Sequence, residues 1–287
     1  MRLTGVPLRL RSRIAGACFV VTGSSRGIGR ELVRLLLELD AVVVMNGRNA
    51  ARLESTVTEL RGSFPNADLS SVAADVSCTD GARLLASHIA DRWDGVDYLI
   101  NNAGASMRGS FADLKEKTLI AMLDGNVKTA ILATTECLPS LRTAGGHVVY
   151  VSTVGALHGF PQISLYSAAK AALQRVAEAI NAELRSDNVT AGIVYLGFVE
   201  NDSDKEIFTA SGDLLRHTRS AMQSQREAAV ALATAAVRRR RRVITVGVGR
   251  LLDIAHRCVP NVVTGVLARS KGSIHAVKRD TDQPNSD

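Results

Sequence analysis

Cysteine and aromatic residues are scarce in this sequence of 287 residues, and it contains no long apolar run. The 4 cysteines lie far apart, with no CxxC pair and no dense spacing, which excludes a cysteine-rich zinc site and a disulfide framework. No metal is expected, and a reducing, cytoplasmic location fits best. No stretch approaches the roughly 18 consecutive apolar residues that a membrane-spanning helix requires. We therefore expect a soluble protein, or at most one attached to a membrane surface.

Acidic residues are outnumbered by basic ones, which gives a net charge of +7, yet the middle of the chain is nearly balanced. The excess comes largely from the amino terminus, the run Arg238 to Arg242 and the segment beyond residue 250. This run, followed by an amphipathic segment, predicts either a solvated corner before the last strand or peripheral contact with an anionic membrane. Nucleic acid is not expected as a partner, because no aromatic residues that could stack on bases accompany the arginines.

Seven short apolar runs rich in valine and isoleucine alternate with segments of helical spacing. The runs are CFVVT, AVVVMN, SSVAAD, DYLINN, HVVYVS, TAGIVYL and VITVGV, and the helical segments are residues 30–39, 50–60, 81–92, 114–141, 166–185 and 226–237. Continuously apolar strands are covered on both faces, and their alternation with helices predicts parallel pairing. The sequence therefore predicts an α/β fold: a single doubly wound domain whose seven-stranded parallel sheet has helices on both faces.

No linker, low-complexity tract or internal repeat interrupts residues 14–250. We therefore divide the chain into a basic leader (1–13), one domain (14–250), and an amphipathic carboxyl-terminal extension with a disordered tail (251–287). Within that extension, Pro260 and Gly265 interrupt the helical spacing.

The glycine-rich segment VVTGSSRGIG places glycines at 23, 27 and 29, between the first strand and the first helix. The amino terminus of a helix offers unpaired N–H groups and a positive dipole end, and missing side chains let a pyrophosphate approach them closely. Three glycines could also serve a plain strand-to-helix turn. Their position in the first strand–helix unit favours a nucleotide site.

The end of the second strand indicates which dinucleotide binds. An NAD site usually places an acidic residue there, whereas an NADP site places an arginine there to pair with the 2′-phosphate. Here Arg48 follows the strand without a carboxylate, and Arg26 lies in the glycine turn, so both charges favour NADP(H). Arg52, one helical turn after Arg48, could join them or be a solvated surface residue. Asp75, which closes the third strand, is placed either to meet the adenine or to cap a turn.

The fourth strand runs into the segment INNAG, residues 100–104. The side chains of Asn101 and Asn102 could simply pin the strand end by hydrogen bonds. The small residues Ala103 and Gly104 would also let a flat ring lie against the backbone. We favour this second interpretation because of the residues that follow.

Tyr166 and Lys170 stand four residues apart at the start of a long amphipathic segment. Residues at i and i+4 share one face of a helix. An ammonium group beside a tyrosine, whose ordinary pKa is about 10, stabilises the phenolate and draws that pKa toward the working pH. The pair therefore predicts a tyrosine general acid or base, although a YxxxK spacing also arises by chance on helix surfaces.

In order and spacing, TGSSRGIG, NNAG, Asn126, VSTVG and YSAAK resemble the short-chain dehydrogenase/reductase family over residues 14–250. The resemblance implies a Rossmann-type fold in which Tyr166 exchanges a proton with the substrate oxygen. It also implies that Lys170 lowers the pKa of Tyr166 and binds the nicotinamide ribose, and that Asn126 holds a water molecule.

The family usually has a serine whose hydroxyl polarises the substrate carbonyl. Thr153, 13 residues before Tyr166, occupies the matching position in this chain. Threonine offers the same donor with an extra methyl group. Ser152 is the alternative if the intervening loop differs in length.

The resemblance and the motifs together give the expected cofactor contacts. They are Gly23, Ser24, Ser25, Arg26, Gly27, Ile28, Gly29, Arg48, Arg52, Asp75, Val76, Asn102, Ala103, Gly104, Tyr166, Lys170 and Val199. After the sixth strand the chain departs from the family pattern, since Leu196 replaces a proline and Asn201 replaces a threonine that contacts the nicotinamide. We expect the nicotinamide amide to meet the backbone around Val199, and the resemblance does not define the substrate floor.

Substrate choice is expected to rest on residues 106–113, residues 156–164 and the loop after Asn201. Their apolar side chains favour a ketone or alcohol over a sugar; these are Met107, Phe111, Leu157, Phe160, Ile163 and Phe208. His158 could touch a polar group of the substrate or be solvated. The segment YLGFVEND and the carboxyl-terminal end are similar to reductases of long-chain keto lipids, such as 3-ketodihydrosphingosine reductases.

The sequence thus predicts an NADP(H)-dependent oxidoreductase of lipid metabolism that interconverts a hydrophobic ketone and its secondary alcohol. The family resemblance implies homodimers or homotetramers formed through the helical segments 114–141 and 166–185. The alternative is a cofactor-binding sensor or scaffold of the same fold. Such proteins generally lose the tyrosine or the lysine, whereas this chain keeps both.

Overall fold

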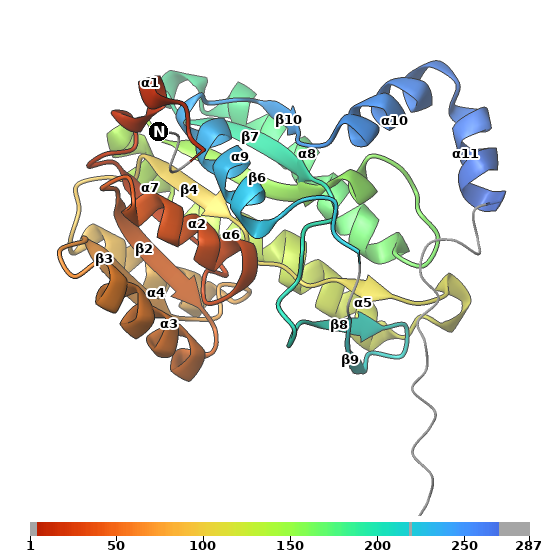
Figure 1. The fold of residues 1–287 in the computed structure, drawn as a ribbon, viewed down its shortest axis with the longest axis horizontal. Coiled ribbons are helices and arrows are strands. Elements are labelled where there is room, and N and C mark those ends of the chain that lie inside the picture. The colour runs from red at the N-terminus through yellow and green to blue at the C-terminus, as the bar shows by residue number, and fades with distance from the viewer. Residues whose placement is uncertain (1–4, 218–219, 270–287) are drawn as a thin grey trace, which may run out of the picture.

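The protein, described here by a computed structural model over residues 5–217 and 220–269, is built on a parallel sheet of seven strands in the order β10-β7-β6-β4-β1-β2-β3 (Figure 1). The strands are β1 (Cys18–Val21), β2 (Val42–Gly47), β3 (Leu69–Ala73), β4 (Tyr98–Asn101), β6 (His147–Thr153), β7 (Thr190–Leu196) and β10 (Arg242–Ile244). This confirms the predicted α/β class and the seven strands. Because the strands are parallel, their carboxyl ends meet at one edge, and the strand order reverses between β1 and β4, where ligands bind in such sheets.

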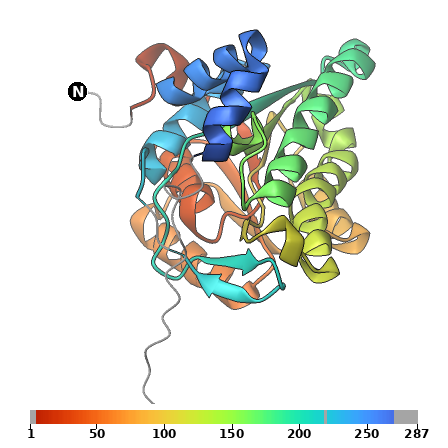
Figure 2. The same ribbon diagram turned by 90° about the vertical axis from the view of Figure 1, so that its right-hand side faces the viewer.

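Helices cover both faces of the sheet, as Figure 2 shows. One face carries α2 (Gly27–Leu37), α3 (Ala50–Ser63) and α9 (Gln225–Val237), and the other carries α4 (Thr79–Ala90), α6 (Thr129–Glu136), α7 (Leu138–Ala144) and α8 (Ser164–Glu183). A separate apolar cluster fills each of the two layers. Helix α9 presents a row of fully buried alanines, including Ala229, Ala233 and Ala236, and these small side chains let it pack closely against α2.

The segment 114–141 is divided into three helices and a π-helical turn, so the expectation of one continuous helix is wrong. Helix α5 (Glu116–Leu123) runs into the turn η2 (Asp124–Lys128), which leads into α6, and α7 has a proline in its first turn. In the widened turn, Thr129 Oγ1 donates to the Asp124 carbonyl at 2.7 Å and satisfies it. Such π-helical turns often mark functional positions, and this one carries Asn126.

A second, three-stranded sheet forms from segments that the sequence assigned to loops. Strand β5 (Met107–Arg108) pairs in parallel with β8 (Glu206–Thr209), which forms an antiparallel hairpin with β9 (Leu214–Arg216). This small sheet lies beyond the carboxyl edge of the large one (Figure 1). Three 3₁₀ turns complete the described elements between the helices: η1 (Phe111–Asp113), η3 (Val154–Ala156) and η4 (Arg185–Asp187).

The last strand is shorter than its apolar pattern predicts, because β10 ends at Ile244 and α10 (Gly247–Cys258) begins three residues later. A Cβ atom at Gly249 would lie 2.6 Å from Val154 Cγ1, so glycine is needed where α10 starts against η3. Pro260 cannot continue α10 and instead opens α11 (Pro260–Arg269). The predicted disordered tail, the segment TDQPNSD at residues 281–287, lies outside the described residues.

At the other end of the chain, α1 (Leu8–Arg11) lies within the predicted basic leader. Leu10 is buried together with Val6 and Ile14 in the apolar cluster shared with α2 and α9. This part of the leader therefore packs on the domain. Within residues 5–217 and 220–269, no helix combines the length and the apolar content needed to cross a bilayer.

The run Arg238 to Arg242 leads into β10 at the amino-terminal edge of the sheet, opposite the edge from which α10 departs. Arg239 donates to the backbone carbonyls of Gly145 and Asn188. Arg242 donates two hydrogen bonds to the carboxylate of Asp253. These contacts support the interpretation of the run as a corner of the domain.

Candidate active site

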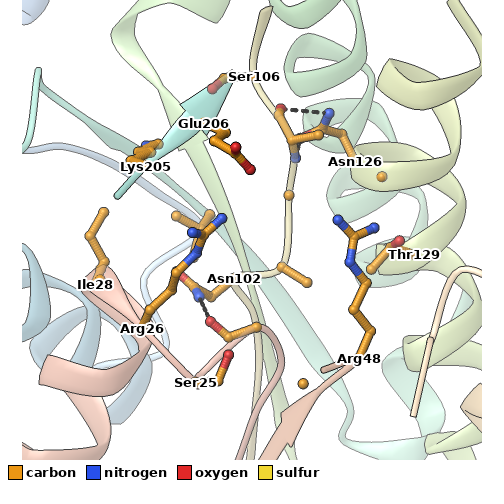
Figure 3. A pocket seen from close by; sticks show the side chains of 18 of the residues that line it. Ser25, Arg26, Ile28, Arg48, Asn102, Ser106, Asn126, Thr129, Lys205 and Glu206 are labelled. Atoms are coloured by element: carbon orange, nitrogen blue, oxygen red, sulfur yellow. Dashed lines mark hydrogen bonds between the residues drawn. The ribbon is translucent and has the colours of Figure 1, made fainter. Parts of the chain in front are cut away.

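A cavity of about 410 Å³ opens at the carboxyl edge of the large sheet, and Figure 3 shows side chains from its wall. The wall is formed by the segments that follow β1, β2, β3, β4, β6 and β7, together with η2 and α8. It brings together all the predicted site residues except Ser24 and Gly29, namely Gly23, Ser25, Arg26, Gly27, Ile28, Arg48, Arg52, Asp75, Val76, Asn102, Ala103, Gly104, Asn126, Ser152, Thr153, Tyr166, Lys170 and Val199.

The glycine turn needs its glycines for backbone reasons. Gly23 and Gly27 have φ angles of +63° and +58°, in the left-handed region that glycine adopts without strain. A Cβ atom at Gly29 would lie 2.5 Å from the Gly23 carbonyl oxygen, so Gly29 lets the turn close instead of lining the cavity. Ser24 also lies behind the wall, where its Oγ accepts a hydrogen bond from the Asn46 N–H at 3.0 Å and ties the turn to β2.

Asn101, the last residue of β4, and Asn102, which follows it, both pin the strand end through their side-chain amides. Asn102 Nδ2 donates to the carbonyls of Thr22 and Gly23, at 3.0 Å each. Asn101 Nδ2 donates to Thr134 Oγ1 at 2.9 Å. The pinning role therefore applies to both, while Asn102 also lines the cavity.

The three predicted arginines lie around one end of the cavity, and Figure 3 shows Arg26 and Arg48 on either side of it. Arg26 Nη1 and Arg52 Nη2 lie 3.6 Å and 3.9 Å from the same oxygen, Asp204 Oδ2. These side chains are all partly exposed, so the pairs add little to stability. They do show that an anionic group is accommodated between Arg26 and Arg52.

Asp75 caps a turn and also lines the cavity. Its Oδ1 accepts a hydrogen bond from the Ser77 N–H at 2.9 Å, which caps a turn, and the residue also lines the cavity. Burial raises the pKa of the Asp75 carboxyl, but the hydrogen bonds from Ser77 and the charges of Arg48 and Lys128 outweigh burial and hold that pKa below its ordinary value. Asp75 is therefore ionised at neutral pH.

Tyr166 and Lys170 share a face of α8 and both line the cavity. Lys170 is buried, and its Nζ donates to the Val151 carbonyl at 3.0 Å. Burial and, to a lesser extent, the positive charge of Lys205 together lower the pKa of Lys170 to about 8. Lys170 is thus an ammonium ion at neutral pH, one helical turn from Tyr166 on α8, and it loses its charge as the pH rises through about 8.

Asn126 stands beside this pair. A Cβ atom at Gly104 would lie 2.8 Å from Asn126 Oδ1 and 3.0 Å from Lys170 Nζ, so the absence of a side chain at Gly104 lets the two polar groups approach the same place. Asn126 Nδ2 donates to the carbonyls of Ala105 and Met122, at 2.9 Å and 3.0 Å. These bonds fix the orientation of the amide, whose Oδ1 lies near Gly104 and accepts a hydrogen bond from the Ala105 N–H at 3.3 Å.

Ser152 and Thr153 both line the cavity but use their hydroxyls differently. Ser152 Oγ donates to the Lys170 carbonyl at 3.1 Å. Thr153 Oγ1 accepts from the Gly155 N–H at 3.3 Å. The hydroxyl proton of Ser152 is therefore engaged by the backbone of α8, whereas the bond shown at Thr153 uses only an acceptor lone pair.

The loop after β7 supplies cavity residues that the sequence interpretation missed: Asp202, Lys205, Glu206 and, from α9, Gln225. Asp202 Oδ2 accepts from the Gly27 N–H at 2.8 Å, and its Oδ1 accepts from Gln225 Nε2 at 2.8 Å. The sequence signal that could have identified these residues is the cluster of acidic residues directly after an expected parallel strand. The carboxyl ends of parallel strands meet at one edge of the sheet, where ligands bind. Leu196 and Asn201, the two positions at which the sequence departs from the family pattern, also line the cavity.

The apolar side chains expected to select substrate do not all reach the cavity. Phe208 lines it, whereas Met107 is fully buried elsewhere and Phe111 is largely exposed to solvent. His158 is buried, and its ring lies 4.4 Å from that of His256 on α10, so the solvated interpretation is wrong. This contact could not be expected from sequence because it joins the loop before α8 to the carboxyl-terminal extension.

Comparison with known proteins identifies the family that the sequence motifs resemble. Residues 17–212 match the short chain dehydrogenase family. The Arabidopsis thaliana protein named 11-beta-hydroxysteroid dehydrogenase 1A is 31% identical over 202 residues, which are 70% of this chain and 57% of that protein. The first curated relatives are longer than this chain, which aligns with 57% to 65% of their length.

Two solved structures show the same fold. A short chain dehydrogenase/reductase from Burkholderia phymatum in complex with NAD has a TM-score of 0.75 and 19% identity, covering 87% of this chain and 95% of that one. A short chain dehydrogenase from Burkholderia cenocepacia in complex with NADP has a TM-score of 0.73 and 24% identity, covering 88% and 98%. With the family match over residues 17–212, the chain belongs to the short-chain dehydrogenase/reductase family.

Proposed function

We propose that the protein is an NADP(H)-dependent oxidoreductase that interconverts a hydrophobic ketone and its secondary alcohol, with Tyr166 as the general acid or base. The observation that carries this proposal is that Tyr166 and Lys170 line the same cavity as the glycine turn. A tyrosine beside an ammonium and a phosphate-binding helix terminus in one cavity is the arrangement that carbonyl reduction by a dinucleotide requires.

The cavity fits a dinucleotide. The amino end of α2 presents the Gly27 N–H, which already binds a carboxylate oxygen of Asp202 at 2.8 Å, so this position accepts an anion. When bound, the cofactor supplies the hydride. The chain would hold its pyrophosphate on the glycine turn, its adenine near Asp75 and Val76, and its nicotinamide near Val199.

The choice of NADP over NAD is proposed from Arg26, Arg48 and Arg52. A 2′-phosphate carries two negative charges, and arginine pairs with phosphate through charge-assisted hydrogen bonds. Asp204 now lies between Arg26 and Arg52, so the phosphate would compete with this carboxylate. Family structures have been solved with either dinucleotide, so the arginines of this chain are the basis for the choice.

The Arg48→Ala variant tests this choice. Hydrogen bonds to charged groups contribute about 1.5–3 kcal/mol, so the KM for NADPH should rise roughly tenfold to 100-fold, while the KM for NADH should stay unchanged. Initial-rate kinetics with each cofactor would measure both constants. Arg83→Ala, which removes an exposed arginine from α4, is the control. An equal rise in both KM values would show that Arg48 does not read the 2′-phosphate.

Thr153 is proposed as the donor that polarises the substrate carbonyl, because Ser152 donates its proton to the Lys170 carbonyl. Removing one such donor typically lowers kcat by about 10²- to 10³-fold. We therefore expect this loss in Thr153→Ala and a near-normal kcat in Thr153→Ser. Ser152→Ala is expected to have the smaller effect, and the reverse order in steady-state kcat would assign the role to Ser152.

A largely apolar substrate is proposed, of the keto-lipid or steroid kind. Phe208, Leu196 and Ala105 line the substrate end of the cavity, and one relative carries the name of a hydroxysteroid dehydrogenase. Steady-state assays over a panel of ketones with both cofactors test the whole proposal. We expect the highest kcat/KM for apolar ketones with NADPH, whereas a preference for sugars or for NADH would contradict it.

We also propose that the chain assembles as a homodimer or homotetramer. Leu119, Ile120 and Leu123 of α5 and Ile131 of α6 are exposed large apolar side chains. Such a group on neighbouring helices is typical of a subunit interface.

A further inference from the structure

Helices α10 and α11 project from the end of the molecule at which the strands of the large sheet finish, and they are among its most exposed elements (Figure 1). Helix α10 is nevertheless fixed to the domain. Gly249 packs against Val154, Asp253 accepts two hydrogen bonds from Arg242, and the His256 ring lies against that of His158. The orientation of α10 on the domain is therefore defined.

The outer face of these helices is apolar. Val248, Leu251 and Ile254 on α10 and Val259, Val262 and Val266 at and within α11 are 47% to 69% exposed. Their spacing of three or four residues, apart from the step between the helices, puts the side chains of each helix on one face. Single exposed apolar residues are ordinary, but a continuous row along two consecutive helices marks a surface that is covered in the working protein.

Positive charge borders this apolar row. Because successive residues of an α-helix are separated by about 100°, Arg250 and Arg257 lie along one edge of the row on α10. Asp253 is the only acidic residue in the segment 238–269. The carboxylate of Asp253 already accepts hydrogen bonds from Arg242. It also pairs with Arg257, whose Nη2 lies 3.2 Å from Asp253 Oδ2. One carboxylate thus faces three arginines, Arg242, Arg250 and Arg257, and Arg250 Nε donates to the neutral backbone carbonyl of Ile244, so the border of the row has a net positive charge.

The same end of the molecule carries further exposed apolar side chains. Leu214 and Leu215 lie on β9, and Phe111 lies on η1 just after β5. Figure 2 looks onto this end and shows α10, α11 and the β8–β9 hairpin all facing the viewer. The cavity is at the carboxyl edge of the large sheet, so these exposed apolar groups lie at the end of the molecule where the cavity opens.

We propose that the face formed by Val248, Leu251, Ile254, Val259, Val262 and Val266, with Arg250 and Arg257, docks on the surface of a bilayer that contains anionic phospholipid. An in-plane amphipathic helix buries its apolar face at the headgroup boundary while bordering arginines reach the phosphates. The arginine run at 238–242 is not part of this surface. The inference concerns binding to lipid and does not depend on catalysis.

A second copy of the chain fits this face less well than lipid. Two-fold pairing would bring Arg250 and Arg257 of both copies into one interface, where the acidic group, Asp253, is already paired on each side. Anionic headgroups supply the missing negative charge without such crowding. The chemistry of the face therefore favours the membrane.

Co-flotation of the full chain with vesicles tests the proposal. We expect binding to phosphatidylcholine vesicles that contain about one third phosphatidylserine, and at least tenfold weaker binding to pure phosphatidylcholine, since each of the two arginines near an anionic surface adds about 1 kcal/mol, or roughly fivefold. The double variant Leu251→Asp, Ile254→Asp should abolish binding. The double variant Arg250→Gln, Arg257→Gln should weaken binding to anionic vesicles at least tenfold but leave weak binding to neutral ones unchanged.

Leu84→Asp is the matched control, because Leu84 is an exposed leucine of α4 away from this face. Circular dichroism and NADPH binding would verify that each variant is folded. Failure of the parent chain to float with anionic vesicles, or equal flotation of the aspartate double variant, would overturn the proposal. So would a change of subunit number in that variant by light scattering without lipid, because it would assign the face to contact between copies.

Discussion

Replacing Tyr166 by phenylalanine is expected to lower kcat about 10²- to 10⁴-fold while NADPH still binds, because a positioned acid or base contributes this much to a proton transfer. The variant removes a single oxygen from a side chain that lines the cavity. Steady-state and single-turnover assays would measure the loss, and quenching of protein fluorescence would measure the affinity for NADPH.

Tyr195→Phe is the control for this variant. It removes the same atom from a tyrosine whose hydroxyl donates to Gln174 and lies outside the cavity wall. This variant should keep its turnover. If Tyr166→Phe kept full turnover, Tyr166 would not be the proton donor. If the parent chain itself bound NADPH without reducing any ketone of the panel, the sensor alternative would be favoured.

Replacing Lys170 by methionine is expected to lower kcat about as much and to change the pH dependence of the reaction. The pKa of Lys170 is lowered to about 8, first by burial and then by the charge of Lys205. Lys170 therefore carries its charge at pH 7 and loses it as the pH rises through about 8. In the parent protein, kcat/KM for ketone reduction should fall on the alkaline side of that value, and Lys170→Met should lose this limb of the profile.

The Lys205→Met variant is a second test of whether Lys170 causes the alkaline limb of the pH profile. Removing the like charge should raise the pKa of Lys170 and move the alkaline limb to higher pH. Lys128→Met, at an exposed lysine paired with Asp124, should leave the limb in place. A limb that stays near pH 8 in Lys170→Met would assign it to another group.

The lowered pKa of Lys170 also has a consequence for stability. Its folded pKa lies below its ordinary value of 10.5, so between about pH 8 and that value the unfolded chain binds more protons than the folded one. The stability of the parent relative to Lys170→Met should therefore rise as the pH increases through this window. Burying the charged amine of Lys170 at the site therefore lowers the free energy of unfolding.

The strand pattern, the glycine turn and the Tyr166–Lys170 spacing could be interpreted from sequence because each depends on neighbours within a few residues. Continuous valine and isoleucine runs must be buried on both faces whatever surrounds them. The order in which parallel strands alternate with helices then places their ends at one edge, so the residues that follow β1, β2, β4 and β6 could be predicted to meet.

The contacts between distant segments could not be predicted. Gly27 and Asp202 are separated by 175 residues, yet the carboxylate of one binds the N–H of the other. His158 meets His256, and Asn126, which lies in the π-helical turn of the segment 114–141, approaches Gly104. Local patterns specify which residues are buried and which residues form turns, because burial and backbone conformation are set within a few positions of the chain. Which loops meet across the cavity depends on how the packed layers place their ends, and that placement is a property of the folded chain as a whole.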